Sequence, residues 1–480
     1  MNSKPIILWY RNDLRIGDHP ALAATAKSGR PVLPVYVLDD DTQGDWRPGG
    51  ASRWWLHHSL TALSAQLGRF GCRLILRRGE AVKIIADIAA EAGAKAVYCS
   101  RGFEPWALTQ ESSLSQRLAE HGIGFDRFSA TLLHDPDQLC TKAGRAFKVY
   151  TPFWRALSAT LIRRPHKAPR ALRGVQIDIA SETLDEWRLL PHDPDWSGGL
   201  RKAWQPGERT AQVRLKRFLQ QHAAHYGTLR DRPDLAATSR LSPHLHFGEI
   251  SPVQCWHAAL AQEAADPSSA TSLEVFRKEL VWREFAYHLL YHWPATPNRP
   301  MRSQFDRFPW KPDPRLLASW QSGWTGYPIV DAGMRELWHT GWMHNRVRMI
   351  VASFLTKHLL QNWQAGEAWF WDCLVDADLA ANSASWQWVA GCGADAAPYF
   401  RIFNPILQGE KFDPDGTYVR RWIPELADLP TKYIFAPWSA PEPVLQAGGV
   451  KLGVTYPKPI VDHKTARSKA LAAYEEMTKS

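Results

Sequence analysis

Residues 278–285, KELVWREF, place three chemically different side chains on one face of a predicted helix. Glu279, Trp282 and Arg283 are three and four positions apart, a spacing that makes side chains neighbours on an α-helix. A carboxylate, an indole and a guanidinium in this order form either a surface salt bridge beside a packed ring or a ligand pocket. In a pocket, Glu279 would hydrogen-bond the ligand, Trp282 would stack on it and Arg283 would meet a phosphate.

A second stretch repeats this arrangement. In TGWMHNRVRMIVASF, residues 340–354, helical periodicity puts Asn345, Arg348 and Met349 on a shared face. An amide, a guanidinium and a thioether side by side again fit either a packed surface or the lining of a cavity.

A third stretch, LVDADLAAN (374–382), supplies the acceptors Asp376, Asp378 and Asn382. The two aspartates could bind a metal ion, but no further ligands cluster nearby. Arg348 is an equally good partner for a carboxylate, so an ion pair is favoured over a metal site.

The segment TSRLS (238–242) follows an Asp-x-Pro turn and precedes a predicted helix. It offers the hydroxyls of Thr238, Ser239 and Ser242 around Arg240. Hydroxyls, backbone N–H groups and a helix dipole together can hold phosphate oxygens. The ordinary alternative is a simple helix cap, for which Ser and Thr are common.

Two tryptophans, Trp386 and Trp388, stand among Ala, Gly, Ser and Asn in DLAANSASWQW. Small residues let a flat ligand approach the backbone closely, while tryptophans at such a place stack, fill space or carry electrons. Core packing accounts for most of the 24 tryptophans of the chain, and these two need neighbouring motifs to decide their role.

The first 130 residues must position part of any such site, and they alternate between two kinds of segment. Strand-like stretches cover residues 5–10, 31–38, 72–78, 94–100 and 124–130, and helix-like stretches cover residues 19–28, 52–70, 80–93 and 107–122. This alternation predicts a Rossmann-like, doubly wound parallel sheet. The motif G-x-G-x-x-G is absent after the first strand, which argues against a standard NAD-binding domain.

The rest of the chain changes in character twice. Residues 131–204 are rich in loops and predict a long linker with short helices. Helical periodicity dominates after residue 205. We therefore expect three parts: an α/β domain over 1–130, a linker over 131–204 and an all-α domain over 205–480.

Composition narrows the class of protein. With 480 residues, 45% hydrophobic and 22% charged, the chain fits a globular protein of two or three domains. No apolar run is long enough to span a bilayer and no secretory signal is evident, so we expect a cytoplasmic location and no membrane partner. The net charge of +10 favours a polyanionic partner. Six cysteines without zinc spacing indicate reduced thiols.

Together the motifs resemble one family. WYRNDLRIGDHPAL, TSRLSPHLHFGEISP, VWREFAYHLL, TGYPIVDAGMRELWHTGWMHNRVRM, DLAANSASWQW and DAAPYFRIFNPILQGEKFDP are similar to those of DNA photolyases and cryptochromes. The resemblance runs from about residue 5 to 440, and RPGGASRWWLHHSL looks most like the bacterial class III members.

This resemblance implies an FAD chromophore inside the helical domain, from which light drives an electron into a damaged base pair. The residues implied to bind FAD are Tyr226, Thr238, Ser239, Arg240, Leu241, Ser242 and Arg283 around phosphates and ribose, and Asn345, Arg348, Asp376, Asp378 and Asn382 around the flavin ring. Asn382 would face the ring nitrogen that takes up a proton. A neutral amide there does not repel a negatively charged reduced ring, whereas a carboxylate would. Plant cryptochromes carry Asp and animal ones Cys at this place, so Asn382 favours repair over signalling.

The same resemblance implies a pocket for a flipped-out lesion. Glu279 and Asn345 would hydrogen-bond the pyrimidine carbonyls, while Trp282, Met349 and Trp388 would form its apolar wall. Members that repair (6-4) lesions have His where this chain has Asn345 and Met349, so a cyclobutane pyrimidine dimer is the expected substrate.

Three further sets of features follow from the resemblance. Trp310, Trp363 and Trp386 match a tryptophan triad that passes electrons from the surface to the flavin. Arg230, Arg401 and Lys411 match positions near the DNA backbone, where contacts are blind to sequence. The α/β domain should hold an antenna chromophore in a cleft facing the helical domain, methenyltetrahydrofolate first and 8-hydroxy-deazaflavin second.

The expected activity is that of a deoxyribodipyrimidine photo-lyase, a DNA repair enzyme that acts as a monomer on UV-damaged DNA and needs no obligate protein partner. The alternative is an FAD-binding blue-light receptor without repair activity. A basic helical nucleic-acid-binding protein without catalysis would leave the Asp and Arg pairs unexplained.

Overall fold

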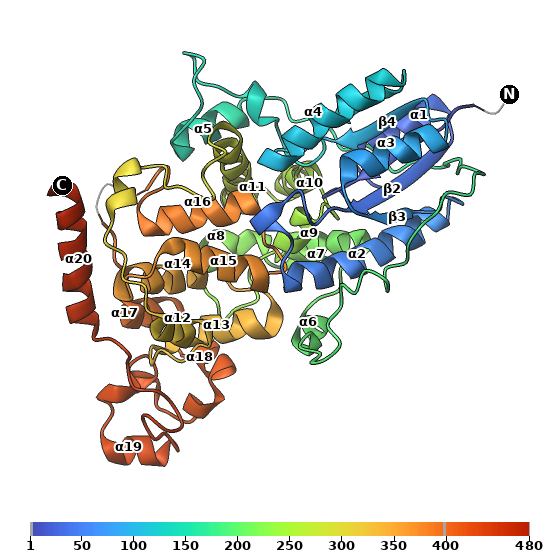
Figure 1. Cartoon of the computed structure of the whole chain (residues 1–480). Helices are drawn as coiled ribbons and strands as arrows, with labels where there is room; N and C mark the ends of the chain where they lie inside the picture. Colours follow the sequence, from blue (N-terminus) through green and yellow to red (C-terminus); the bar gives the residue numbers. More distant parts are fainter. Residues whose placement is uncertain (1–2, 397–399, 480) are drawn as a thin grey trace.

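The computed structural model describes residues 3–396 and 400–479. Its N-terminal part is a parallel sheet of five strands in the order β3-β2-β1-β4-β5 (Figure 1). The strands are β1 Ile6–Tyr10, β2 Val32–Leu38, β3 Ile75–Arg78, β4 Ala96–Ser100 and β5 Gly124–Phe128. The expected doubly wound α/β fold is confirmed.

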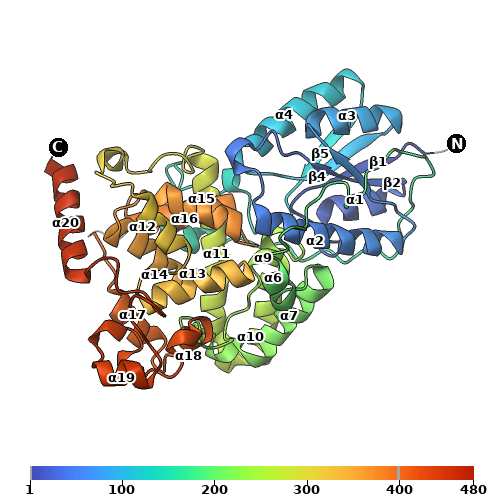
Figure 2. The same cartoon turned by 60° about the horizontal axis from the view of Figure 1, so that its bottom comes forward.

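Helices cover both faces of this sheet. In Figure 2, α1 and α2 lie on one side of the strands and α3 and α4 on the other. Their bounds are α1 Pro20–Ser28, α2 Gly50–Gly68, α3 Ala81–Glu91 and α4 Pro105–Glu120. Burial on both faces explains why β1 and β2, IILWY and VLPVYVL, are continuous apolar runs without polar alternation.

A long connection joins β5 to the helical half. It contains α5 Tyr150–Ser158 and α6 Gly198–Ala203, and its other stretches are mostly irregular. Arg163 in this connection forms an ion pair with the buried Asp18 of the α/β part. The connection is therefore fixed to the domain that it leaves.

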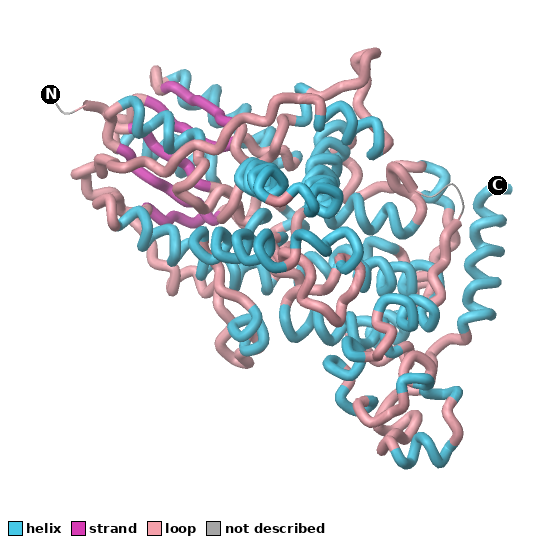
Figure 3. Tube along the Cα trace, turned by 180° about the vertical axis from the view of Figure 1, so that it is seen from behind, coloured by secondary structure: helices cyan, strands magenta, loops and turns pink. Residues whose placement is uncertain are grey.

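The second half is almost entirely helical, as expected, and lies beside the α/β part with the C-terminus at its far end (Figures 1 and 3). Its helices are α7 Glu208–Gln221, α8 Tyr226–Leu229, α9 Ser242–His246, α10 Pro252–Ala265, α11 Ala270–His292, α12 Pro314–Gln321, α13 Pro328–Thr340, α14 Asn345–Ser353, α15 Trp363–Cys373, α16 Leu379–Ala390, α17 Pro405–Phe412, α18 Thr417–Trp422, α19 Glu442–Ala447 and α20 His463–Lys479. A π-helical turn, Phe354–His358, follows α14. No helix among the described residues is long and apolar enough to cross a membrane.

Candidate functional site

The three side chains of KELVWREF contact three different segments. The Glu279 carboxylate accepts a hydrogen bond from Arg230 of α8. Trp282 stacks face to face on Tyr150 of α5, with ring centroids 3.7 Å apart. Arg283 donates to the carbonyl of Thr131 at 2.9 Å. This part of α11 is thus a junction between elements instead of a surface patch.

Glu279 is held in a partly buried position. Burial raises its pKa, and the neighbouring guanidinium of Arg230 opposes this shift. Arg230 therefore points inward to a carboxylate. Beyond it, Asp231 pairs with Arg346 at 2.8 Å, which links α8 to the start of α14.

The start of α14 carries the second predicted group. Asn345 is its first residue and is exposed. Arg348 donates to the Met343 carbonyl at 2.8 Å and to the Asp376 carboxylate at 2.9 Å. The predicted ion pair is confirmed. Met349, next to Arg348, is half-buried.

Arg240 is the centre of the TSRLS segment and lies between two indoles. Its guanidinium carbon is 4.6 Å from the Trp204 ring centroid and 4.5 Å from that of Trp342. Its φ of 49° is in the left-handed region, which non-glycine residues rarely adopt and which often marks ligand sites. The Trp342 indole also donates to the Ser242 hydroxyl at 3.3 Å.

A second arginine, Arg214 of α7, also lies over the Trp204 ring, with its guanidinium carbon 5.2 Å from the ring centroid. Burial lowers the pKa of Arg240, and it lowers that of Arg214 to about 10. Neither forms a salt bridge with another described residue, and each has a buried Nε without a hydrogen-bond partner in that part of the chain. Glu336 and Asp376 act on Arg240 without pairing with it, so two half-buried cations without an ion pair to a described carboxylate form a site that favours an anion.

Asp378 caps α16 and joins three elements. It accepts from the Ala381 N–H at 2.9 Å and from the Tyr287 hydroxyl at 2.7 Å, and His246 lies 3.6 Å away. Burial alone would raise the pKa of Asp378, but His246 and Arg283 lower it to about 2. It is therefore ionised at neutral pH.

Asn382 lies one turn further along α16, and its orientation is fixed. Its NH₂ group donates to the Glu367 carbonyl at 3.0 Å, and no described residue donates to its Oδ1. The neighbouring Ser383 hydroxyl donates to the Glu367 carboxyl. Burial raises the pKa of Glu367 to about 8, so this acid is mostly neutral at pH 7. The Asn382 oxygen is left as a free acceptor.

The two tryptophans of α16 have different surroundings. Trp386 is buried and packs on Gly366 of α15, where a Cβ would come within 2.1 Å of the indole. Trp388 is half-buried and donates to the Asp395 carbonyl at 3.1 Å. Trp363 is buried and Trp310 is half-buried, and both belong to the apolar cluster around Trp386. All three predicted triad tryptophans thus lie in or against one apolar cluster.

The remaining predicted residues lie as follows. Tyr226 is buried in α8, Leu241 is buried, and Thr238 and Ser239 are half-buried. Arg401 and Lys411 are exposed. Residues 397–399 of the last quoted motif lie outside the described residues.

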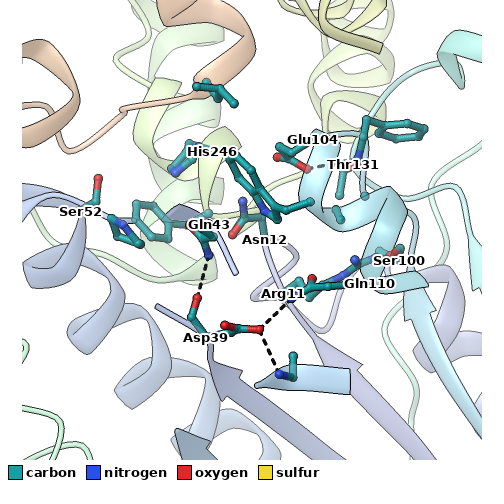
Figure 4. A pocket seen from close by; sticks show the side chains of 18 of the residues that line it. Arg11, Asn12, Asp39, Gln43, Ser52, Ser100, Glu104, Gln110, Thr131 and His246 are labelled. Atoms are coloured by element: carbon teal, nitrogen blue, oxygen red, sulfur yellow. Dashed lines mark hydrogen bonds between the residues drawn. The ribbon is translucent and has the colours of Figure 1, made fainter. Parts of the chain in front are cut away.

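A pocket lies between the two halves at the carboxyl ends of β1, β2 and β4, and Arg283, predicted to meet the FAD phosphates, lines this pocket. Figure 4 shows polar side chains around it, among them Asn12, Asp39, Glu104 and Gln110 from the α/β part and His246 from α9. Trp106 and Trp371 also line it. The pocket is at the point where the strand order reverses, between β1 and β4, as is usual for ligands of such sheets.

Several site residues escaped the sequence reasoning. Arg214, Trp204 and Trp342 complete the cation group, Glu367 orients Asn382, and Tyr150 supports Trp282. Their contacts join segments that are far apart in the sequence. The high tryptophan content was therefore the only signal, and it concerned Trp204 and Trp342 alone.

Comparison with known proteins agrees with this geometry. A family model described as the FAD binding domain of DNA photolyase matches residues 276–476, and one described as DNA photolyase matches residues 6–171. A deoxyribodipyrimidine photo-lyase of Agrobacterium fabrum is 50% identical, over 100% of this chain and 99% of that protein. Cryptochrome-1 of Arabidopsis thaliana is 37% identical, over 98% of this chain and 70% of that protein.

Solved structures give the same result. The structure of a bacterial class III photolyase from Agrobacterium tumefaciens superposes with a TM-score of 0.96 at 50% identity, over 100% of this chain and 99% of that one. A Synechocystis cryptochrome superposes with a TM-score of 0.89 at 31% identity, over 98% of this chain and 100% of that one.

Proposed function

The chain belongs to the DNA photolyase and cryptochrome family, and within it we propose that this protein repairs cyclobutane pyrimidine dimers in DNA by light-driven electron transfer. The 50% identity over the full length of a deoxyribodipyrimidine photo-lyase supports this function more than the lower similarity to cryptochromes supports signalling. The proposed parts are an antenna domain over 1–130, a linker over 131–204 and an FAD domain over 205–480.

The single observation that carries the proposal is the set of unpaired polar atoms in the helical half. Arg240 and Arg214 have buried Nε atoms without partners, and Asn382 Oδ1 accepts from no described residue. A dinucleotide supplies what these groups lack, since its phosphates accept hydrogen bonds and the ring N–H of a reduced flavin donates one. These residues therefore fit FAD.

FAD, when bound and reduced, would supply an electron on illumination. The chain holds the two ends of this cofactor differently. Arg240, with Thr238, Ser239 and Ser242 beside it, would bind the phosphates, whereas Arg348 and Asp376 would lie along the ring. Asn382 would accept from the ring N–H without adding negative charge.

The lesion would enter from the exposed side of the same half. Trp282 and Trp388 would form apolar walls against the flipped pyrimidines, and Met349 would line the space between them. Glu279 and Asn345 would hydrogen-bond the carbonyls. Burial raises the pKa of Glu279, while the ion pair with Arg230 opposes this rise and holds the carboxyl group in place.

Trp386, Trp363 and Trp310 would reduce the cofactor before repair. Their burial falls from the interior to the surface, which suits transfer in short steps. The exposed Arg401 and Lys411 would contact DNA phosphates. Arg230 forms an ion pair with Glu279, so its main role would be to hold Glu279 in place. The protein would act as a monomer in the cytoplasm.

The pocket between the halves would hold the antenna. Flat aromatic walls from Trp106 and Trp371 and acceptors such as Glu104 suit a ring system with polar edges. Methenyltetrahydrofolate is our first assignment and 8-hydroxy-deazaflavin our second.

A repair assay separates this function from that of a blue-light receptor. We expect the purified, photoreduced protein to convert thymine dimers in a UV-irradiated oligonucleotide to thymines in blue light but not in darkness, as measured by chromatography of the digested product. Bound flavin without any repair would favour the receptor. A protein without flavin would contradict both functions.

A further inference from the structure

Tyr150 begins α5 in the connection between the halves, yet its side chain supports Trp282, a wall of the proposed lesion pocket. Its ring stacks on Trp282 with centroids 3.7 Å apart and planes 4° apart. Tyr150 is 8% exposed and Trp282 is 37% exposed. The tyrosine thus covers one face of the indole, while the indole keeps much of its surface open.

The hydroxyl of Tyr150 fixes this stack. It donates to the Lys278 carbonyl at 2.7 Å, four residues before Trp282 on the same helix. Ring and hydroxyl therefore bind the same turn of α11. Because an exposed indole can change its rotamer, a stack held at both its face and its edge restricts where Trp282 points.

The second tryptophan wall has a support of its own. The Trp388 indole donates to the Asp395 carbonyl at 3.1 Å. Trp388 is thus held by the loop that follows α16, whereas Trp282 is held by Tyr150 of α5.

We infer that Tyr150 is a positioning residue that fixes the indole of Trp282 before a lesion binds. This inference rests on the proposed function, in which this indole receives the flipped pyrimidines. A wall fixed in advance reduces the ordering cost of binding. The effect should fall on lesion affinity and leave flavin binding unchanged, since Tyr150 does not belong to the proposed FAD-binding set.

Binding in darkness tests this directly. We compare the flavin-loaded wild type with Tyr150→Leu and Tyr150→Phe, using a duplex with one thymine dimer and the same duplex undamaged. Tyr150→Leu should weaken binding of the damaged duplex roughly 10-fold, in the range of one base–aromatic stack, and leave the undamaged duplex and flavin absorbance unchanged. Tyr150→Phe keeps the stack but loses the hydrogen bond to the Lys278 carbonyl, so its loss of affinity should be smaller, about threefold. Tyr98→Leu, at a tyrosine that packs on Phe128 in the α/β half, is the matched control and should bind like the wild type.

A double variant tests the same contact from the other ring. Trp282→Leu removes the indole that Tyr150 supports, so adding Tyr150→Leu to it should cost no further affinity for the damaged duplex. Where Tyr150→Leu does not fold, Tyr150→Phe carries the test through its smaller loss. Wild-type affinity in Tyr150→Leu, a loss in Tyr150→Phe as large as that in Tyr150→Leu, or a further loss in the double variant would overturn the inference. A wild type that binds both duplexes equally would overturn the proposed function, and with it the inference.

Discussion

The two regions that we propose bind ligands differ in how their charged groups are paired, although Arg11 Nη1 of the interdomain pocket is also buried without a hydrogen-bond partner among the described residues. In the pocket between the halves, Asp39 accepts from the N–H groups of Thr42 and Ala81, the Thr42 hydroxyl and the Gln110 amide. In the helical half, by contrast, Arg240 and Arg214 have no carboxylate partner among the described residues and each leaves a buried Nε unpaired.

This difference indicates how strongly each region depends on its ligand. Buried donors without partners are costly, so a site that keeps them is stabilised by whatever supplies the acceptors. Polar groups that satisfy one another need no ligand. We therefore expect the helical half to require its flavin for stability and the interdomain pocket to accept or lose an antenna with little effect on the fold.

The largest effect should follow from removing the phosphate-binding cation. Arg240→Ala should reduce the FAD bound by the purified protein more than 100-fold, since a desolvated charge-assisted contact is lost. Flavin absorbance per chain measures this. The matched variant Arg164→Ala, at an exposed arginine of the connection, should retain full flavin. Full flavin in Arg240→Ala would remove the contrast between the two regions.

The next effect separates the chemistry from cofactor binding within the helical half. Glu279→Ala should lower the quantum yield of repair about 10-fold, because one charge-stabilising hydrogen bond is lost, while flavin content stays normal. Repaired dimers per absorbed photon provide the measurement. Loss of flavin in this variant would mean that Glu279 supports the cofactor instead.

A smaller and conditional effect should follow from interrupting the tryptophan triad. Trp386→Phe removes an oxidisable ring, together with the outer indole atoms that pack on Gly366, so photoreduction should slow by about 10-fold or more. Repair by protein that has been reduced chemically should equal that of the wild type. Equal losses under both conditions would contradict the relay role.

The interdomain pocket should respond most weakly. Glu104 lines it and has only long hydrogen bonds, from the Phe103 N–H at 3.2 Å and the Tyr287 hydroxyl at 3.5 Å. Glu104→Ala should reduce antenna content and the efficiency of repair at antenna wavelengths severalfold, with flavin content and repair at flavin wavelengths unchanged. An action spectrum separates the two contributions.

A last prediction concerns pH. Burial raises the pKa of Glu367 to about 8 from an ordinary value of 4.5, so the folded state binds a proton that the unfolded state releases. Stability from this group is complete below about pH 4.5 and is lost as pH rises toward 8. Glu367→Gln should therefore unfold at the same temperature as the wild type near pH 4.5 and a few degrees higher at pH 8. Glu91→Gln, at an exposed glutamate of α3, should show no such trend.

Much of this arrangement could be predicted from the chain. The alternating segments of the first 130 residues predicted the sheet, because burial on both faces leaves a strong apolar pattern in β1 and β2. The ion pair between Arg348 and Asp376 followed from their charges. Local patterns were sufficient wherever neighbours in sequence are also neighbours in space.

The supporting contacts could not be predicted in this way. Arg240 meets Trp204 and Trp342 across long sequence separations, and Tyr150 reaches Trp282 from a stretch that looked like a linker. Arg230 matched a DNA-backbone position, but it pairs with Glu279. Such contacts depend on tertiary packing, which leaves no periodic pattern in the sequence.

The most direct measurement relates flavin occupancy to repair in one preparation. The protein is stripped of FAD, reloaded to graded occupancy, reduced, and illuminated with an oligonucleotide that contains a single thymine dimer. We predict that the initial repair rate rises in proportion to bound FAD and is zero in the stripped protein. Repair that persists without FAD, or full occupancy with intact dimers, would contradict the account.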